Sequence, residues 1–519
     1  MANLKKLLTI SIILLSSLFI HAQDAVINID LSRPLMISRF EIGATYTSGY
    51  WEYGDPTAVN NAKNLLINGI AFQNQHIMGW GVGDPEPQPG VYYWKDLDHR
   101  VNLMRSINKP EMITFCTAPG WMKGTDDWSM EAAVEDRYDG AFAHLCAAVA
   151  SRYPDVKYFQ VWNELKGYWS TSLNNWDYVR YTNLYNAVYD SVKAVRPDAK
   201  IGGPYIPIQG DGGVELGKSG RDTYKPIGSK DWDVINYWLK NKHGADFFCF
   251  DYSLIDYHDT NTYSFSEKMK LTKYFGLVVQ QLSQKIDLPI FISEFYGGDD
   301  STDVQFTAAN HASCYLHAIL NNASLGLIWN PEEGEIDNYL FTSTYYSTGG
   351  QPSPHYWVVE GINRYFSKGT QLYYATSSSG DVEVLSSAEK TMLINKTGNL
   401  LNVSVNGNIV QLFRYDVKFM DTPAVTEIDK GQQIRSPEIN ISYSGSRPYL
   451  KINFSSSAEV NIRIFDILGR QLGNYASRLF PGTNTISIFR DSINLPSGIY
   501  FVLINGPGIN SVRKFYILK

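Results

Sequence analysis

Strand-like and helix-like segments alternate eight times between residues 37 and 329, and this alternation constrains the fold more than any other feature of the sequence. The predicted strands are short apolar runs, such as residues 111–116. The predicted helices, such as residues 94–107, carry apolar side chains at helical spacing. Eight such units over about 300 residues are typical of a (β/α)8 barrel, an α/β fold of about 250 residues.

Two of the predicted strands end at a glutamate. Asn163 and Glu164 follow an aromatic and β-branched run at residues 158–162, and Glu294 follows a similar run at residues 288–292. The chain between them has room for about three βα units. Because the carboxyl ends of barrel strands share one mouth, the two carboxylates can face each other there, as glycoside hydrolysis requires. Taken alone, the Asn-Glu pair favours an alternative without a functional role, in which Asn163 caps a turn and Glu164 is solvated.

After residue 365 the alternation stops, and short strand-like runs separated by Gly, Asn and Asp turns follow. We interpret residues 366–420 as a small β-sandwich beside a catalytic barrel of residues 24–365. Residues 421–437 have little apolar content and are predicted to be a linker. Residues 438–519 form a further all-β unit of immunoglobulin-like length.

Residues 1–23 have the organisation of an export signal. Lys5 and Lys6 precede an apolar run of 14 residues, and residues 20–23 supply a cleavage region. The run is shorter than the roughly 20 apolar residues of a membrane span. We therefore predict an exported, soluble protein with no membrane span after removal of the signal.

The composition is that of a globular protein with an ample core, with 44% hydrophobic and 19% charged residues. The net charge is −7 and the pI is about 5.8, so no nucleic-acid partner is expected. The chain has 12 Trp, 35 Tyr and 24 Phe residues, which can fill a core or line a sugar-binding cleft.

No metal ion or cofactor is expected, because the sequence has no Cys-X-X-Cys motif and no His-rich ligand spacing. Acidic residues in two predicted loops match no calcium-loop template and are interpreted as solvated: Asp299, Asp300, Glu332, Glu333 and Glu335. An exported protein can form disulfides. The apolar contexts of the four cysteines instead favour buried free thiols at Cys116, Cys146, Cys249 and Cys314.

Residues 35–420 resemble the clan A glycoside hydrolases and are most similar to family 39, the β-xylosidase and iduronidase group. The resemblance is carried by Val-Trp-Asn-Glu at residues 161–164 and Ile-Ser-Glu-Phe at residues 292–295, with further matches at residues 112–122 and 257–258. It implies a (β/α)8 barrel that hydrolyses O-glycosidic bonds with retention of configuration.

The family pattern implies a role for each matched residue. Glu294 would be the nucleophile, Glu164 the general acid/base, and Asn163 the donor to the sugar 2-hydroxyl. One departure lies at the second strand, where the clan has an Arg-Phe-His run and this chain has Asn-Gln-His ending at His76. His76 stands for the histidine of the family, and the arginine is missing.

Three further residues at strand ends are candidates to hydrogen bond to Glu294 and keep it ionised, namely Tyr257, His258 and Tyr296. Each could equally be a satisfied residue of the barrel rim. Trp121 and Trp329 end the third and eighth predicted strands, where they could form the floor of a sugar subsite rather than part of the core. Trp51 and Trp80 are weaker candidates for the same role.

Residues 438–519 resemble the C-terminal sorting domain of the bacterial type IX secretion system. The match is carried by residues 465–470, 495–501 and 514–519. The resemblance implies the type IX machinery as a partner and passage through the outer membrane. Removal of the domain would then release the protein or attach it to the cell surface.

Together these observations predict an exported retaining glycoside hydrolase that cleaves β-linked or arabinofuranosyl bonds of plant or microbial polysaccharide with two glutamates. Two alternatives remain open at this point. One is an endo-acting β-glycanase of the same clan. The other is a surface carbohydrate-binding protein without catalysis, since a fold alone does not define a function.

Overall fold

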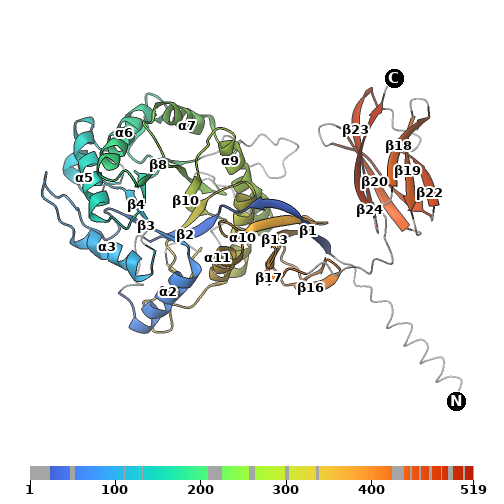
Figure 1. Ribbon diagram of the computed structural model, residues 1–519, viewed down its shortest axis with the longest axis horizontal. Helices are drawn as coiled ribbons and strands as arrows, with labels where there is room; N and C mark the ends of the chain where they lie inside the picture. The colour runs from blue at the N-terminus through green and yellow to red at the C-terminus, as the bar shows by residue number, and fades with distance from the viewer. Residues whose placement is uncertain are drawn as a thin grey trace, which may run out of the picture. The chain divides into compact units, whose positions relative to one another are not determined.

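The computed structural model divides into two units, Met1–Ala424 and Val425–Lys519 (Figure 1). In the first unit it describes residues 24–46, 53–109, 111–127, 129–130, 132–208, 225–255, 263–297, 303–334 and 338–423. In the second it describes residues 438–444, 447–454, 458–466, 470–480, 482–488, 495–506 and 509–517. The predicted export signal and residues 424–437 of the predicted linker lie outside the described residues, whereas Asp421, the first residue of that linker, ends strand β17 (Val417–Asp421).

Eight strands of the first unit form a closed, all-parallel barrel, as the sequence predicted. In barrel order they are β2 (Glu41–Thr45), β3 (Phe72–His76), β4 (Met112–Phe115), β5 (Tyr158–Val161), β8 (Lys200–Pro207), β9 (Phe247–Ser253), β10 (Ile290–Tyr296) and β11 (Leu325–Trp329). A short hairpin of β6 (Trp169–Ser170) and β7 (Asn175–Trp176) follows β5. The strands are buried almost throughout, because helices cover the outside of the barrel.

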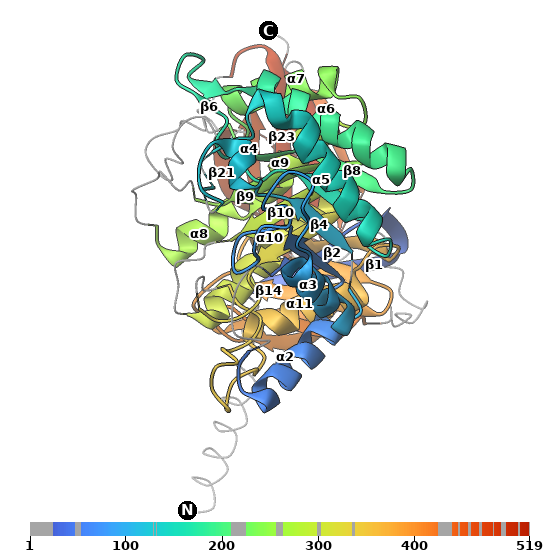
Figure 2. The same cartoon turned by 90° about the vertical axis from the view of Figure 1, so that its left-hand side faces the viewer.

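The helices surround the barrel strands (Figure 2). They are α2 (Pro56–Gly69), α3 (Lys95–Ser106), α4 (Gly120–Lys123), α5 (Asp139–Arg152), α6 (Tyr178–Val195), α7 (Ser229–Asn241), α8 (Phe265–Leu271), α9 (Lys273–Ser283), α10 (Val304–Leu320) and α11 (Pro354–Tyr365). Helix α2 shows why such segments are helical. The Asp55 side chain caps its first turn, Pro56 occupies the first position, and Ala58, Ala62 and Leu66 form one buried stripe at a spacing of four.

The predicted boundary of the barrel at residue 24 is wrong. Strand β1 (Ala25–Ile37) pairs with β12 and β15, far along the chain, and the first barrel strand begins only at Glu41. The burial pattern explains this, because Ala25, Ile27 and Ile29 are buried while the residues between them are less buried. Such alternation fits a sheet with one covered face, whereas barrel strands are buried on both faces.

Strand β1 belongs to a seven-stranded sheet of order β16-β15-β1-β12-β13-β14-β17. The other members are β12 (Gln371–Ser377), β13 (Val382–Ser387), β14 (Lys390–Asn395), β15 (Leu401–Val405), β16 (Asn408–Leu412) and β17 (Val417–Asp421). Apolar residues from both halves of the sheet share one core, so the sheet folds over itself like a sandwich. This confirms the predicted accessory sandwich and adds β1 to it.

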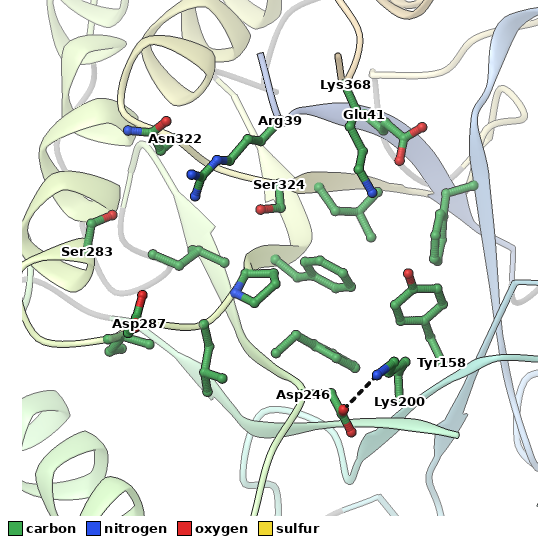
Figure 3. A pocket seen from close by; sticks show the side chains of 18 residues that line it. Arg39, Glu41, Tyr158, Lys200, Asp246, Ser283, Asp287, Asn322, Ser324 and Lys368 are labelled. Carbon is green, nitrogen blue, oxygen red and sulfur yellow. Dashed lines mark hydrogen bonds and ion pairs between the residues drawn. The ribbon is translucent and has the colours of Figure 1, made fainter. Parts of the chain in front are cut away.

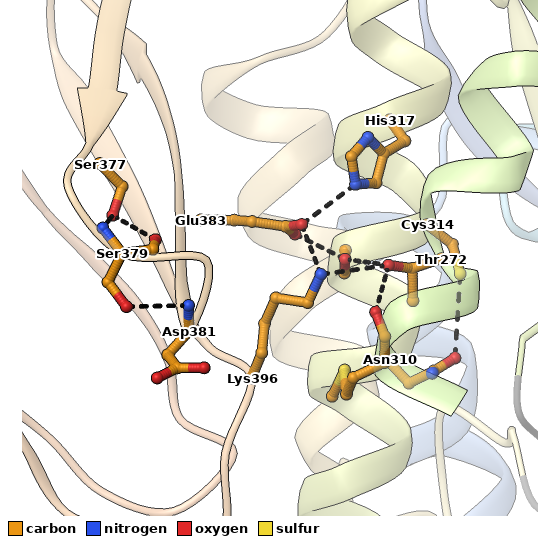
Figure 4. A network of polar contacts seen from close by, with 11 residues as sticks. Thr272, Asn310, Cys314, His317, Ser377, Ser379, Asp381, Glu383 and Lys396 are labelled. Atoms are coloured by element: carbon orange, nitrogen blue, oxygen red, sulfur yellow. Dashed lines mark hydrogen bonds and ion pairs between the residues drawn. The ribbon is translucent and has the colours of Figure 1, made fainter. Parts of the chain in front are cut away.

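A buried polar network joins the accessory sheet to the barrel (Figure 4). Glu383 of β13 accepts hydrogen bonds from Ser313 Oγ at 2.5 Å and Lys396 Nζ at 2.6 Å, and it pairs with His317 Nε2 at 3.0 Å. Burial opposes ionisation of Glu383, but the contacts with His317 and Lys396 outweigh it and lower its pKa to about 2. The ionised carboxylate therefore links helix α10 to the sheet.

The second unit is all-β, as predicted. One sheet contains β18 (Glu438–Ser444), β19 (Arg447–Phe454) and β22 (Gly482–Ser487), and the other contains β20 (Ala458–Asp466), β21 (Gln471–Leu479), β23 (Gly498–Gly506) and β24 (Ile509–Ile517). The two sheets share a hydrophobic core of their own. Within the described residues of the whole chain, no helix has the length and apolar character needed to cross a membrane.

Candidate active site

Glu164 lies just beyond the carboxyl end of β5, on a backbone turned sharply away from the strand. Trp162, Glu164 and Leu165 have φ angles of 71°, 48° and 53°, in the left-handed region that residues other than glycine rarely adopt. Trp162 anchors this turn, because its side chain is buried and its indole N–H donates to the backbone carbonyl of Lys166. Such backbone strain is typical of functional sites. The Glu164 carboxylate forms an ion pair with Lys166 Nζ at 2.6 Å.

Glu294 lies on β10 and points into the same end of the barrel. An irregularity in the pairing of β10 with β9 falls between Ile292 and Glu294. A bulge of this kind re-aims side chains, so two consecutive residues can face the interior. Ser293 indeed donates to Gln160 Oε1 at 2.7 Å inside the barrel, while Glu294 reaches the site above it.

Two tyrosine hydroxyls hold the Glu294 carboxyl group. Tyr296 donates to Oε2 at 2.5 Å and Tyr205 donates to Oε1 at 3.0 Å. The sequence analysis named Tyr296 for this role but missed Tyr205. Tyr205 lies on β8 with a φ of 53°, at an irregularity in the pairing of β8 with β9 between Pro204 and Ile206. The Gly-Gly-Pro-Tyr run at residues 202–205 was a signal of this distortion.

Asp251 is a third carboxyl group in the site, and the sequence analysis did not identify it. It lies on β9 in register with Glu294, and it is 3% exposed. One oxygen each of Glu164, Asp251 and Glu294 lie within 4.8 Å of one another. Three carboxylate oxygens at this spacing have the chemistry to hold a divalent cation as well as to act on a substrate.

The environment raises the pKa values of both buried carboxyl groups. Burial, and then the nearby charge of Glu164, raise the pKa of Glu294 to about 7, against the opposing effects of Tyr296, Lys166 and Tyr205. Burial and the charges of Glu294 and Glu164 raise the pKa of Asp251 well above its usual value. Burial therefore favours the protonated forms of both Glu294 and Asp251.

His76, Asn163 and two tryptophans form one wall of the site. His76 Nε2 lies 3.4 Å from Asn163 Oδ1, and the His76 ring packs against Trp80 and Trp329 at centroid distances of 4.6 and 5.8 Å. Burial lowers the pKa of His76 to about 3, so its imidazole is neutral. Asn163 Nδ2 is buried and has no hydrogen-bond partner in the described part of the chain, which leaves a donor free for a ligand.

The position of the missing arginine at the end of β3 is taken by a polar network inside the barrel. Asn74 Nδ2 donates to Thr45 Oγ1 at 3.1 Å, and Asn74 Oδ1 accepts from Thr114 Oγ1 at 2.9 Å. Gln160 Nε2 in turn donates to Thr114 Oγ1 at 2.6 Å. This network joins neighbouring strands beneath the carboxyl groups, and the described contacts of Asn74 do not include Glu294.

Other predicted site residues have different surroundings or fall outside the description. Trp121 is half-buried on α4, where its indole N–H donates to the carbonyl of Glu86, and its predicted sugar contact stays a prediction. The interpretation of Glu332 as solvated is wrong, because Glu332 is buried and accepts hydrogen bonds from the backbone and side chain of Thr344, which organise a loop. The predictions for Trp51, Tyr257, His258, Asp299, Asp300 and Glu335 lie outside the described residues. The predicted sixth strand, 246–257, in fact ends at Ser253.

The four cysteines are buried with free thiols, as the sequence predicted.

A hollow of about 680 Å³ lies at the opposite end of the barrel from the carboxyl groups (Figure 3). Its lining includes the first residues of seven barrel strands: Glu41, Phe72, Tyr158, Lys200, Phe247, Ile290 and Leu325. That face of a barrel normally serves stability rather than catalysis.

Comparisons with known proteins agree with this architecture. Residues 446–518 match the family model described as a secretion system C-terminal sorting domain. No curated protein matches the chain.

Solved structures of similar fold share little sequence with this chain. SrfJ from Salmonella typhimurium is 13% identical, with a TM-score of 0.54, over 77% of this chain and 93% of its own. A conserved exported protein from Bacteroides fragilis is 12% identical, with a TM-score of 0.53, over 89% and 99%. The catalytic domain of the GH30 xylanase C from Talaromyces cellulolyticus is 12% identical, with a TM-score of 0.50, over 88% and 98%.

The fold and the site define the class of this protein. It is a (β/α)8-barrel protein with an accessory β-sandwich, a fold similar to that of the catalytic domain of the GH30 xylanase C. It carries a C-terminal sorting domain of the type IX secretion system, which indicates export.

Proposed function

We propose that this chain is a retaining glycoside hydrolase that acts outside the cell on β-linked or arabinofuranosyl bonds of plant or microbial polysaccharide. One observation carries the proposal. Oxygens of Glu164 and Glu294 lie within 4.8 Å of each other at the carboxyl ends of β5 and β10. Retaining enzymes place their two carboxyl groups about 5–5.5 Å apart, whereas inverting enzymes need about 6.5–9.5 Å to admit a water molecule.

In this mechanism Glu294 attacks the anomeric carbon and forms a glycosyl ester, while Glu164 transfers its proton to the leaving oxygen. Glu164 then removes a proton from the water that hydrolyses the ester, and Glu294 leaves as a carboxylate. The hydrogen bonds from Tyr205 and Tyr296 stabilise the ionised form of Glu294 that both ends of this cycle require.

The mechanism requires one of the two glutamates to be protonated and the other to be ionised. The productive state has the proton on Glu164 and the negative charge on Glu294, as in other sites that separate an acid from a nucleophile. Because the pKa of Glu294 is raised to about 7, part of the free protein carries a proton on Glu294 near neutral pH, and this proton must leave before Glu294 can attack.

Hydrolysis of a panel of aryl β-glycosides, aryl arabinofuranosides and polysaccharides tests the proposal. The wild type should cleave at least one of them, and Glu294→Ala should abolish cleavage. Glu164→Ala should lose activity on natural substrates but keep much of it on dinitrophenyl glycosides, whose leaving group needs no proton. Glu41→Ala, at the opposite end of the barrel, serves as the control. A wild type that binds glycans and cleaves none would support the carbohydrate-binding alternative.

A further inference from the structure

Asp251 has no role in the two-glutamate mechanism, and the fold does not explain it. Both of its carboxyl oxygens are buried, and neither has a hydrogen-bond partner in the described part of the chain. A buried polar group without a partner costs about 1–3 kcal/mol. Buried polar groups in folded proteins are almost always paired, so an orphan carboxyl group at a substrate site indicates a partner that arrives with the ligand.

Glu164 and Glu294 already have hydrogen-bond or ion-pair partners within the protein, and in this respect Asp251 differs from them. Each oxygen of Glu294 accepts a hydrogen bond from a tyrosine, Tyr205 or Tyr296. Glu164 is paired with the ammonium group of Lys166. A cation held by all three carboxyl groups would have to compete with these three donors. Of the three carboxyl groups, Asp251 alone has both oxygens without a partner in the described part of the chain, and one of them lies within 4.8 Å of oxygens of Glu164 and Glu294.

We propose that Asp251 is a substrate-binding residue whose carboxyl group hydrogen bonds to a ring hydroxyl of the sugar bound between Glu164 and Glu294. The inference rests on the proposed hydrolase function and adds a contact between protein and sugar that the two-glutamate mechanism does not include. A ligand group that both donates and accepts a hydrogen bond fits this position, since burial raises the pKa of Asp251 well above its usual value and so favours its protonated form. A protonated carboxyl group donates one hydrogen bond and accepts another, as a sugar hydroxyl also does.

The position of Asp251 makes the contact specific. It lies in register with Glu294 on the adjacent strand, so a sugar whose anomeric carbon meets Glu294 brings its ring hydroxyls past Asp251. Asn163 Nδ2, a further buried donor without a partner in the described part of the chain, follows β5 at the same barrel mouth. Asp251 and Asn163 would thus fix the ring from two strands and select the configuration of its hydroxyls.

The test pairs variants of Asp251 with substrates that lack one hydroxyl. Values of kcat/KM are measured for wild type, Asp251→Asn and Asp251→Ala on the best aryl glycoside of the panel and on its monodeoxy analogues. Asp246→Asn, which changes a carboxylate just before the other end of β9, is the matched control. Thermal unfolding of each variant confirms that it is folded.

For the wild type, removal of one particular ring hydroxyl from the substrate should lower kcat/KM roughly 10- to 100-fold, which corresponds to the loss of a hydrogen bond to a buried polar group. Asp251→Ala should lose a similar factor on the full sugar, and it should lose nothing further on that same deoxy analogue. Asp251→Asn, which also donates and accepts, should recover most of the loss.

Three outcomes would overturn the inference. The first is an active wild type for which Asp251→Ala lowers kcat/KM equally on the full sugar and on every deoxy analogue, which indicates a positioning role. The second is Asp251→Ala activity equal to that of Asp246→Asn. The third is a thermal stabilisation by calcium chloride that EDTA reverses and Asp251→Asn abolishes, which makes Asp251 a metal ligand. A wild type that cleaves no glycoside contradicts the proposed function instead.

Discussion

Tyr296 lies two residues after Glu294 on the same strand, and its hydroxyl donates a 2.5 Å hydrogen bond to Glu294 Oε2. Side chains at this spacing point to the same face of a strand, so one element places both Glu294, the proposed nucleophile, and its hydrogen-bond donor. Tyr205 supplies the second donor from β8. Both hydrogen bonds oppose the rise in the pKa of Glu294 that burial causes.

Removing either hydroxyl group should slow catalysis. Tyr296→Phe and Tyr205→Phe are each expected to lower kcat/KM by about 10- to 150-fold, because a hydrogen bond to a charged group contributes about 1.5–3 kcal/mol. The effect should be larger for Tyr296, whose bond is shorter. Tyr185→Phe removes a buried hydroxyl bonded to the Gly244 carbonyl and is the control. Site variants no slower than this control would show that the tyrosines serve only packing.

Lys166 should set the pH range of activity. Its positive charge lowers the pKa of Glu294, so Lys166→Met is expected to raise that pKa above its value of about 7. Since Glu294 must be ionised to attack, the acidic limb of the kcat/KM profile should move to higher pH. The pH profile of Lys200→Met, at the opposite end of the barrel, should match that of the wild type. A limb that stays in place or moves to lower pH contradicts this electrostatic role.

The nucleophile should reduce stability above neutral pH. Its folded-state pKa of about 7 exceeds the ordinary value of 4.5, so the folded protein binds the proton more tightly than the unfolded chain does. Stability is therefore full below pH 4.5 and falls as the pH rises through 7, by roughly 3 kcal/mol for this shift. Glu294→Gln removes the charge and should be inactive but more stable than the wild type at pH 8. The advantage should vanish near pH 4 in chemical denaturation, and a variant less stable at both pH values would refute this.

The sequence predicted the barrel and the pair of glutamates because both depend on local patterns. Strand and helix periodicity is visible within each βα unit, and a glutamate after an apolar run marks a strand end. The roles of Tyr205 and Asp251 were not predicted, because the orientation of their side chains depends on irregular pairing between neighbouring strands. The sequence of one strand does not show such an irregularity. Asp251 also lies within an aromatic run, Phe-Phe-Cys-Phe-Asp-Tyr, that reads as a wholly buried strand.

Strand β1 was not predicted, and its residues were assigned to the barrel domain, for a related reason. Its partners β12 and β15 lie more than 300 residues later in the chain, so nothing near residues 25–37 indicates the sheet that they join. The burial alternation of this strand was present in the sequence, with Ala25, Ile27 and Ile29 on one face. Proximity in sequence to the first barrel strand nevertheless favoured the wrong sheet.

The ionised Glu383 should hold the accessory sheet to the barrel. Glu383→Gln leaves Lys396 without a carboxylate partner and is expected to cost about 2–3 kcal/mol of unfolding free energy at pH 7, since breaking a largely buried pair is costly. Because the pKa of Glu383 is lowered to about 2, its contribution is present above pH 4.5 and is lost as the pH falls toward 2.

Urea denaturation at pH 7 and pH 3 measures this contribution. Asp421→Asn removes the exposed partner of Lys390 and should change stability much less than Glu383→Gln does, because solvent screens this pair. If Glu383→Gln costs no more than this control at pH 7, the network does not stabilise the junction. A cost that grows toward pH 3 would contradict the assigned charge of Glu383.

Trapping of the glycosyl-enzyme tests the central claim most directly. The protein is incubated with a 2-deoxy-2-fluoro glycoside that carries a dinitrophenyl leaving group, matched to the best substrate, and is then digested and analysed by mass spectrometry. The account predicts one fluoroglycosyl adduct on the peptide that contains Glu294, and none on Glu294→Gln. An adduct on Glu164 or Asp251, or hydrolysis with inverted anomeric configuration and no adduct, would contradict it.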